Sequence, residues 1–416
     1  MRISDRLSAL KPSTTLAVTA TAARLKAQGV DVLSFAAGEP DFDTPQKIKD
    51  AAIKALQAGR TGYAPVPGDP TTRAVIAAKL RDENAIPDIS ADNVLVTVGA
   101  KSAIYLALSA LFDAPRTAED QGELVLPTPA WVSYEPQGRL CGACVIEVPT
   151  TAASGFRMAP EQLRKAITPR TRAVLINSPS NPCGVMYSPA ELKALADVIA
   201  DAASTVAPDI AIISDEIYEK IVYGEDPHCS IGSIPSVAAR TITVNGLSKA
   251  YAMTGWRLGY MGASGDSGRS IIQAATKLQS QTTTSIPNFF QPAIQVALTQ
   301  CAAEVEEMRQ AFARRATLIY ERIAVMPGLV CPRPTGAFYV FPDVSVHFGR
   351  TSRGGRPIGD AVSFAAALLE EQHIAAVPGE DFLGPGRNCL RFSFACSDET
   401  ITEGMDRLSA FLEGLH

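Results

Sequence analysis

A lysine and an arginine eight residues apart, Lys249 and Arg257, carry the strongest chemical signal in the sequence. Lys249 follows a short apolar run that is typical of a buried strand. A lysine in a desolvated pocket loses proton affinity and becomes a nucleophile toward carbonyl carbon. An arginine presents a planar fork of donors that suits a phosphate dianion. Taken singly, Lys249 could be a solvated loop lysine and Arg257 an ordinary ion-pair partner, so their surroundings decide the interpretation.

Further polar side chains follow other apolar runs of the chain. They stand in Gly99-Ala100-Lys101, Pro129-Ala130-Trp131, Asn177 to Asn181, Asp215-Glu216-Ile217-Tyr218 and Asn245 to Lys249. In open α/β sheets, ligands bind in the crevice beyond the carboxyl ends of the strands. A lysine, a carboxylate, a phenol, an amide and an indole at successive strand ends therefore predict a binding site at that edge.

Seven short apolar runs predict the strands that position these side chains. They are Val94–Val98, Glu123–Leu126, Cys144–Val148, Ala173–Ile176, Ile210–Ile213, Thr241–Val244 and Leu258–Met261. Helix-length segments separate the runs, as in a sheet covered on both faces. We therefore expect an α/β fold with a large, doubly wound, mostly parallel seven-stranded sheet.

A smaller α+β domain is expected to accompany this sheet. We assign residues 46–290 to the large domain, and residues 1–45 and 291–416 to the small one. The small domain should hold a long helical stretch (Pro292–Ala324), three strands (Ala337–Phe341, Ile374–Val377 and Cys389–Ser393) and a closing helix from Asp398. The proline-rich segment Met326–Thr335 is typical of a boundary.

Composition excludes several classes of protein. The 416 residues include 46% hydrophobic and 19% charged side chains, which excludes intrinsic disorder. A formal net charge of −5 leaves no general basic surface for nucleic acid. The longest apolar stretch, Val94 to Phe112, is interrupted by polar residues and glycine, so we expect no membrane span. With eight sparse cysteines and no recognisable export signal, we expect free thiols and a cytoplasmic location.

Other enzyme classes lack their sequence signatures. With four histidines and no HExxH spacing, we expect no metal site and no Ser-His-Asp chemistry. Cys141 and Cys144 have redox-motif spacing, but no second pair accompanies them, and two small residues leading into a strand are the simpler interpretation. Neither GxGxxG nor GxxxxGK[ST] occurs, which argues against a nicotinamide oxidoreductase and a P-loop enzyme.

The segment from Gly246 to Gly259, GLSKAYAMTGWRLG, is similar throughout to the pyridoxal-phosphate attachment signature of class I aminotransferases. Six further motifs of the family occur along the chain in the family's order: AGEPDF from Ala37, GYAP from Gly62, PAWVSY from Pro129, NSPSNPCG from Asn177, SDEIYE from Ser214 and RFSFA from Arg391. The match extends from about Lys11 to the C-terminal helix. It most resembles the prokaryotic aspartate aminotransferase branch, which includes the aspartate/prephenate aminotransferases. A collinear series is far more specific than one short motif.

The resemblance implies a fold-type-I enzyme that binds pyridoxal 5′-phosphate. Lys249 would attach to the cofactor and, once released, act as the base that moves the substrate's proton. Asp215 would pair with the pyridine nitrogen, so that the ring can draw off electrons. Tyr218 and Asn181 would bind the ring's phenolic oxygen. Trp131 would stack on the ring, with a core tryptophan as the alternative.

The resemblance also implies a site for the cofactor's phosphate. Its contributors would be Arg257, Ser248 and the backbone N–H groups of Gly99, Ala100 and Lys101, which stand at a predicted helix start. Many relatives carry a second serine three positions before the lysine. Gly246 stands there, so we expect that one side-chain contact is missing. Tyr63 would reach the phosphate of the neighbouring subunit, which implies a homodimer with active sites shared across the interface.

Arg391 resembles the arginine that grips the substrate's α-carboxylate, and a surface ion pair is its alternative. Gly38 would donate its backbone N–H to the same carboxylate, since glycine allows close approach of the backbone. Trp131 and Asn181 would also border the substrate.

A dicarboxylic substrate is expected from a second set of matches. Eukaryotic-type relatives bind the distal carboxylate with an arginine from the stretch that corresponds to residues 278–286, where this chain has none. In the prokaryotic branch, Lys101 would take this task, with Ser13 and Thr14 close by. Lys11 matches a position associated with prephenate, and a solvated lysine on the N-terminal arm is the alternative.

We therefore expect a ping-pong aminotransferase whose partners are small molecules, namely amino acids and 2-oxo acids. It would move the amino group of aspartate (or glutamate) to an acceptor such as 2-oxoglutarate, with prephenate as a further acceptor. An aromatic or broad-specificity aminotransferase, or another pyridoxal-phosphate lyase, stays open as an alternative. A regulator built on this fold would need an N-terminal DNA-binding module, which we do not expect before Gly38. The role of Cys183 is left open.

Overall fold

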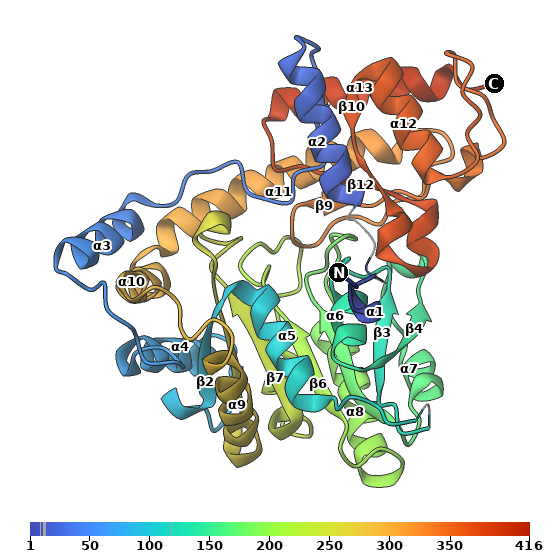
Figure 1. Cartoon of the computed structure of the whole chain (residues 1–416). Helices are drawn as coiled ribbons and strands as arrows, with labels where there is room; N and C mark the ends of the chain where they lie inside the picture. The colour runs from blue at the N-terminus through green and yellow to red at the C-terminus, as the bar shows by residue number, and fades with distance from the viewer. Residues whose placement is uncertain (9, 11–13, 118) are drawn as a thin grey trace.

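A seven-stranded sheet lies at the centre of the larger part of the molecule (Figure 1). The computed structural model describes residues 1–8, 10, 14–117 and 119–416. In spatial order the strands are β2 (Val94–Val98), β8 (Leu258–Ala263), β7 (Thr241–Gly246), β6 (Ala211–Asp215), β5 (Thr171–Asn177), β3 (Glu123–Thr128) and β4 (Cys144–Pro149). β8 runs antiparallel to both neighbours, and the other pairs are parallel. The predicted α/β class and mostly parallel seven-stranded sheet are confirmed.

Apolar side chains alternate between the two faces of this sheet, as the two-residue period of a strand requires. Leu175 and Ile213 share one buried cluster with α5 and α9, whereas Val174 and Ile212 share another with α8. Because both faces are covered, the strands are near-continuous apolar runs in the sequence. The helices of this part are α3 (Gln46–Gln57), α4 (Pro70–Asp82), α5 (Gly99–Leu111), α6 (Tyr134–Leu140), α7 (Pro160–Ala166), α8 (Pro189–Thr205), α9 (Gly265–Ser280) and α10 (Gln291–Gln300).

The second part of the molecule packs helices around two small sheets (Figure 1). One sheet has the order β11-β12-β9, and in the other β1 pairs in parallel with β10, which brings the N-terminal segment to the C-terminal part. The strands are β1 (Leu33–Ser34), β9 (Tyr339–Val340), β10 (Ile374–Ala375), β11 (Val377–Pro378) and β12 (Leu390–Ser393), and the helices are α2 (Thr14–Ala27), α11 (Ala302–Ala324), α12 (Ala361–Gln372) and α13 (Asp398–Glu413). The short helix α1 (Asp5–Ser8) is drawn next to α6 of the larger part (Figure 1). The division at residues 46 and 290 stays a prediction.

Three predicted elements of this part were wrong in extent. The stretch Pro292–Ala324 is two helices, because the backbone of Cys301 leaves helical geometry (φ −113°, ψ 24°) between α10 and α11. The run Ile374–Val377 is split into β10 and β11, which pair with different partners. Of Ala337–Phe341 only β9 is a strand, since Ala337 has a positive φ of 58° that an extended strand does not allow.

Candidate active site

A cleft of about 1020 Å³ lies at the carboxyl ends of the central strands. That volume is at the upper end of the range for small-molecule sites, roughly 300–1,000 Å³. The structure brings most of the predicted site residues together in its lining: Gly38, Ala100, Lys101, Trp131, Asn181, Asp215, Tyr218, Ser248, Lys249, Arg257 and Arg391.

Two other predicted residues, Gly99 and Tyr63, are not part of this lining. Gly99 lies directly before Ala100 at the start of α5. Tyr63 is 92% exposed, and its side chain does not contribute to the lining. Lys11 and Ser13 lie outside the described residues, and Thr14 is described only as the first residue of α2.

Asp215 ends β6 with a carboxylate that is almost fully buried. The hydroxyl of Tyr134 donates to Oδ2 across 2.6 Å, and the backbone N–H of Ile217 donates to Oδ1 across 3.2 Å. Burial raises the pKa of Asp215 to about 6, against the lowering effects of Tyr134, Ile217 and Lys249. These donors therefore hold a buried carboxylate in the ionised form near neutral pH.

Lys249 follows β7 and reaches the same cleft. Its Nζ donates to the backbone carbonyl of Gly38 and lies 5.8 Å from the centroid of the Tyr218 ring. Burial, followed by the nearby charge of Arg391, lowers the pKa of Lys249 to about 8. A lysine with this pKa gives up its proton far more readily than a solvated one, as a nucleophile or base must.

Arg257 and the N-terminus of α5 form a cradle for an anion. Arg257 adopts the left-handed conformation (φ 57°, ψ 48°), and a Cβ atom on Gly99 would lie 2.6 Å from its Nη2. A Cβ on Gly259 would lie 2.3 Å from the backbone nitrogen of Ala100. Glycine at both positions therefore lets a guanidinium and the free N–H groups of a helix start meet closely.

Ser248 lies beside this cradle, and Gly246 two residues earlier is enclosed. A Cβ on Gly246 would lie 2.9 Å from the carbonyl oxygen of Leu258 and 3.1 Å from Cα of Gly259. The missing serine contact therefore has a structural reason, because β8 leaves no room for a side chain at position 246.

Arg391 enters the cleft from β12 and is almost fully buried. Its Nη1 donates to Oδ1 of Asn181 across 3.0 Å, and its Nη2 donates to the carbonyl of Ala36 across 2.9 Å. Its buried Nε has no hydrogen-bond partner in the described part of the chain. Its Cζ lies 4.7 Å from the ring centroid of Tyr339.

Lys101 and Trp131 lie together at one side of the cleft. Nζ of Lys101 is 5.0 Å from the Trp131 ring centroid, and Trp131 packs edge-on against Tyr134 at 5.2 Å. Burial, followed by the positive charge of Arg257, lowers the pKa of Lys101. Within the described residues, neither Lys101 nor Arg257 forms an ion pair with a carboxylate.

Comparison with known proteins identifies the family. A model of aminotransferase classes I and II matches residues 30–408. The chain belongs to this aminotransferase family. An aspartate aminotransferase of Geobacillus stearothermophilus is 42% identical over 99% of both chains. An aspartate/prephenate aminotransferase of Cereibacter sphaeroides is 41% identical over 99% of both chains. The solved structure of a Thermus thermophilus aspartate aminotransferase with maleate superimposes with a TM-score of 0.88 at 40% identity, covering 99% of this chain and 100% of that one.

The identification confirms an aminotransferase of the predicted fold type. Among the helices of the described residues, none has both the length and the apolar character needed to cross a membrane. Cys183 is buried with Phe341 and Cys389 in an apolar cluster and does not line the cleft. It therefore fills space in the aminotransferase and does not shape its pocket.

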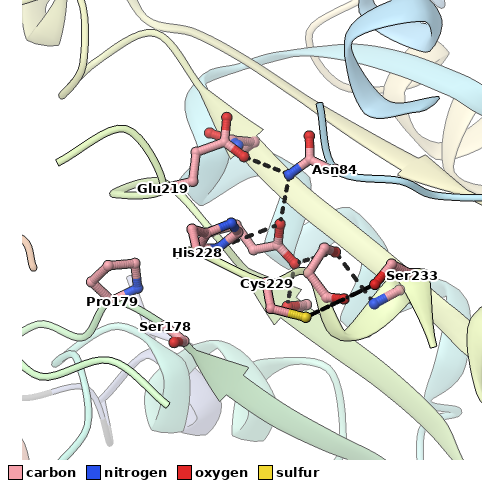
Figure 2. A network of polar contacts seen from close by, with 12 residues as sticks. Asn84, Ser178, Pro179, Glu219, His228, Cys229 and Ser233 are labelled. Carbon is pink, nitrogen blue, oxygen red and sulfur yellow. Dashed lines mark hydrogen bonds and ion pairs between the residues drawn. The ribbon is translucent and has the colours of Figure 1, made fainter. Parts of the chain in front are cut away.

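A buried polar network lies behind Asp215, on the opposite face of β6. Oε1 of Glu216 accepts from Ser214 and Ser230 across 2.8 and 2.7 Å. The amide of Asn84 bridges Oε2 of Glu216 and Oε2 of Glu219 across 3.2 and 2.6 Å. Figure 2 shows Asn84 joined by dashed lines to Glu219 and to the carboxylate next to His228. These bonds anchor the turn that carries both Asp215 and Tyr218.

Three members of this network, Glu216, Glu219 and His228, offer ligand atoms within 4.8 Å of one another, as a metal site would. The ammonium of Lys79 pairs with Glu219 and supplies a positive charge there. Burial raises the pKa of Glu219, but Lys79, His228 and Asn84 outweigh it and bring the pKa to about 2. In the aminotransferase, Lys79 therefore supplies to this network the positive charge that a metal ion would supply.

Two tyrosines of the cleft were missed by the sequence analysis. Tyr134 stands in the PAWVSY motif, where its position three residues after Trp131 was the available signal, and no role was assigned to it. Tyr339 lines the cleft from β9. The sequence around Tyr339 contains no signal of this role, because only the pairing of β9 with β12 brings Tyr339 to Arg391.

Proposed function

We propose that this aminotransferase binds pyridoxal 5′-phosphate and transfers the amino group of aspartate (or glutamate) to a 2-oxo acid such as 2-oxoglutarate. One observation carries the proposal. Lys101, Lys249, Arg257 and Arg391 line one cleft around the buried Asp215, and none forms an ion pair with a carboxylate of the described residues. Arg391 is buried and Lys249 is half-buried, and a charge without a counter-ion is costly at such positions, so the cleft favours a ligand with several negative charges.

The residues of the cleft fit the cofactor. The cradle formed by Arg257, Ser248 and the start of α5 suits its phosphate, because donors and the helix dipole favour a dianion. Asp215 suits the pyridine nitrogen, since an ionised carboxylate keeps that nitrogen protonated. Asn181 and Tyr218 would bind the phenolic oxygen, and Trp131 would stack on the ring. When bound, the cofactor supplies an electron sink for charge that develops at the substrate's Cα.

The protein's own groups would then bind the substrate and move its proton. Arg391 holds the α-carboxylate through its guanidinium, with Gly38 beside it, and so fixes the orientation of Cα. Nζ of Lys249 accepts the proton from Cα, and its pKa of about 8 suits a base that works near neutral pH.

Aspartate is favoured as donor by the position of Lys101. A second carboxylate would find this cation beside Trp131, on the same cleft as Arg391. Two relatives named above are aspartate or aspartate/prephenate aminotransferases, and the Thermus structure was solved with maleate, a four-carbon dicarboxylate. We include prephenate as a further acceptor, since it also carries two carboxylates. The contributions of Lys11, Ser13 and Thr14 stay predictions.

We also propose a homodimer. Tyr63 is 92% exposed, which is unusual for a large aromatic side chain. Placed against a second copy, it would contact that copy's phosphate cradle, so each active site would need both subunits. Light scattering of the purified protein should give twice the mass of 44.0 kDa, and a monomeric holoenzyme with full activity would exclude this arrangement. The cytoplasmic location stays a prediction.

The test of the function is a panel of amino donors with 2-oxoglutarate as acceptor, followed by prephenate with the best donor. We expect aspartate to have the highest kcat/KM and the purified holoenzyme to absorb visible light in a pH-dependent way. A higher kcat/KM for phenylalanine or tyrosine would favour the aromatic alternative. Colourless protein that stays inert after pyridoxal 5′-phosphate is added would overturn the proposal.

A further inference from the structure

Tyr339 occupies a position that no part of the proposed mechanism uses. Its hydroxyl lies 2.9 Å from the hydroxyl of Tyr218, and both side chains are almost completely buried. A Cβ on Gly38 would lie 3.2 Å from the Tyr339 hydroxyl. The same Gly38 accepts a hydrogen bond from Lys249 through its carbonyl. Tyr339 therefore lies next to both Tyr218 and the backbone that holds the attachment lysine.

The hydrogen bond between the two phenols has one possible direction when Tyr218 serves the cofactor. Each phenol carries a single proton. If the proton of Tyr218 is donated to the ring oxygen, then only Tyr339 can donate to Tyr218. A phenol that accepts a hydrogen bond becomes a stronger donor, because hydrogen bonds in a chain polarise one another. The Tyr339 hydroxyl would thus strengthen the donation from Tyr218.

The ring of Tyr339 has a second contact, with Arg391. The guanidinium carbon lies 4.7 Å from the ring centroid, which is within the range of cation–π attraction. β9 and β12 carry these residues as neighbouring antiparallel strands, with Ser393 opposite Tyr339. The ring therefore contacts the arginine while the hydroxyl contacts Tyr218, three residues after the end of β6.

Tyr339 is also held firmly in place between the two parts of the molecule. A Cβ on Gly184 would lie 1.9 Å from the carbonyl oxygen of Tyr339, so the two backbones are in direct contact. The ring packs against Phe338 at 4.8 Å and against Tyr218 at 5.9 Å. A side chain so enclosed can keep both of its contacts at fixed geometry.

We propose that Tyr339 is a positioning residue with two separable tasks: its hydroxyl donates to Tyr218 and sets the strength of that phenol's bond to the cofactor, and its ring supports Arg391 for the substrate's α-carboxylate. The inference rests on the proposed function, since it needs a cofactor oxygen at Tyr218. Through these two contacts, one side chain links the carboxylate site to the cofactor site.

The first test uses Tyr339→Phe, which removes the hydroxyl and keeps the ring. With a weaker donor at Tyr218, more negative charge stays on the cofactor's oxygen and retains the neighbouring proton. The pH midpoint of the bound cofactor's visible absorbance should therefore rise by roughly 0.3 to 1 unit. The dissociation constant of the cofactor, measured by equilibrium dialysis, should rise roughly 2- to 10-fold. KM for aspartate should stay within about 2-fold of the wild type, because the ring under Arg391 is retained.

The second test uses Tyr339→Leu, which removes the ring as well. Succinate, a dicarboxylate, serves as the probe, and its binding is followed by the change in the absorbance spectrum. Its dissociation constant should be roughly 2- to 30-fold higher in Tyr339→Leu than in Tyr339→Phe. Tyr187→Phe is the matched control. Tyr187 is a buried tyrosine whose oxygen accepts from the backbone of Met158 and whose side chain does not line the cleft, so removal of its hydroxyl should not move either measurement.

A double variant decides whether Tyr339 acts through Tyr218. Tyr218→Phe with Tyr339→Phe removes both hydroxyls and leaves no buried phenol unpaired, and it should titrate like Tyr218→Phe alone. A further shift in the double variant, or an unchanged midpoint in Tyr339→Phe, would overturn the inference. If the wild type itself shows no absorbance titration, it is the proposed function that fails.

Discussion

The hydroxyl of Tyr134 and the carboxylate of Asp215 are joined by a 2.6 Å hydrogen bond inside the protein, between α6 and the end of β6. Burial alone would favour the neutral acid. The bond opposes burial, and the resulting pKa of Asp215 of about 6 lies just below neutral. Asp215 is therefore mostly ionised at pH 7, but its pKa lies only about one unit below that pH.

Removal of this hydroxyl should make Asp215 harder to ionise. In Tyr134→Phe the pKa of the carboxyl should rise by roughly one unit, because hydrogen bonds to charged groups are the strong ones. The acid limb of the pH profile of kcat should move upward by the same amount, and kcat at pH 7 should fall about twofold, because the ionised fraction of Asp215 drops from about nine-tenths to about one half. An acid limb that stays in place, with unfolding temperature unchanged, would show that Tyr134 does not control the charge of Asp215.

Lys249→Ala should abolish transamination. A positioned general base contributes roughly 10² to 10⁴ in rate, and here the same side chain also attaches the cofactor. The pH-dependent visible absorbance should vanish together with the activity. Lys165→Ala, at an exposed lysine on α7, should change neither. Survival of turnover in Lys249→Ala would remove Lys249 from its proposed role.

Arg391→Lys should raise KM for every amino acid tried. A lysine cannot form two parallel hydrogen bonds with a carboxylate, and the loss of one charge-assisted bond corresponds to roughly a 10- to 100-fold rise. Because all substrates share the α-carboxylate, aspartate and phenylalanine should be affected alike. Steady-state kinetics with both donors check this, and a loss confined to aspartate would place Arg391 at the distal carboxylate instead.

Lys101→Met should act selectively. The variant keeps the apolar stem beside Trp131 and removes only the charge, so kcat/KM for aspartate should fall roughly 10-fold or more. The value for phenylalanine should change little, since that donor has no second carboxylate. Equal losses for both donors would assign Lys101 to the phosphate or to the fold.

Acid should weaken the network behind the active site through Glu219. Its folded pKa of about 2 lies below its ordinary value of 4.5, so the stability that it contributes is fully present above pH 4.5 and is lost as pH falls toward 2. The loss amounts to roughly 3 kcal/mol at most. Urea unfolding of Glu219→Gln at pH 7 should show a decrease of the same order, since Lys79 is then left buried and unpaired.

Asp197→Asn provides the comparison for this prediction. Asp197 pairs with Lys193 on the exposed side of α8, where side-chain exposures are 56% and 59%. Loss of an exposed pair should cost less than about 0.5 kcal/mol. Equal effects of Glu219→Gln and Asp197→Asn would contradict the structural role of the buried network.

The strands of the large sheet were predictable because burial on both faces leaves an apolar signature in each of them. The direction of β8 was not, since an antiparallel strand with both faces covered has the same composition as its parallel neighbours. The break between α10 and α11 was also hidden. The apolar spacing continues across Cys301, and only the packing of the two helices against different neighbours separates them.

Within the site, residues inside collinear motifs could be expected to meet, and the cleft does bring Lys249, Asp215, Arg257 and Arg391 together. Contacts between distant segments could not be foreseen. Tyr134 reaches Asp215 only because α6 packs near the end of β6, and Tyr339 reaches Tyr218 across 121 positions of sequence. Such pairs depend on tertiary packing, for which a single sequence contains no local pattern.

The enclosure of Gly246 has a consequence for protein engineering. A designer who wished to tighten coenzyme retention would look first to the serine that many related enzymes carry there. In this scaffold the hydroxymethyl group would collide with the main chain of Leu258 and Gly259, so Gly246→Ser should lower the yield of folded enzyme without improving retention. Successful redesign would have to remodel the neighbouring strand together with that position.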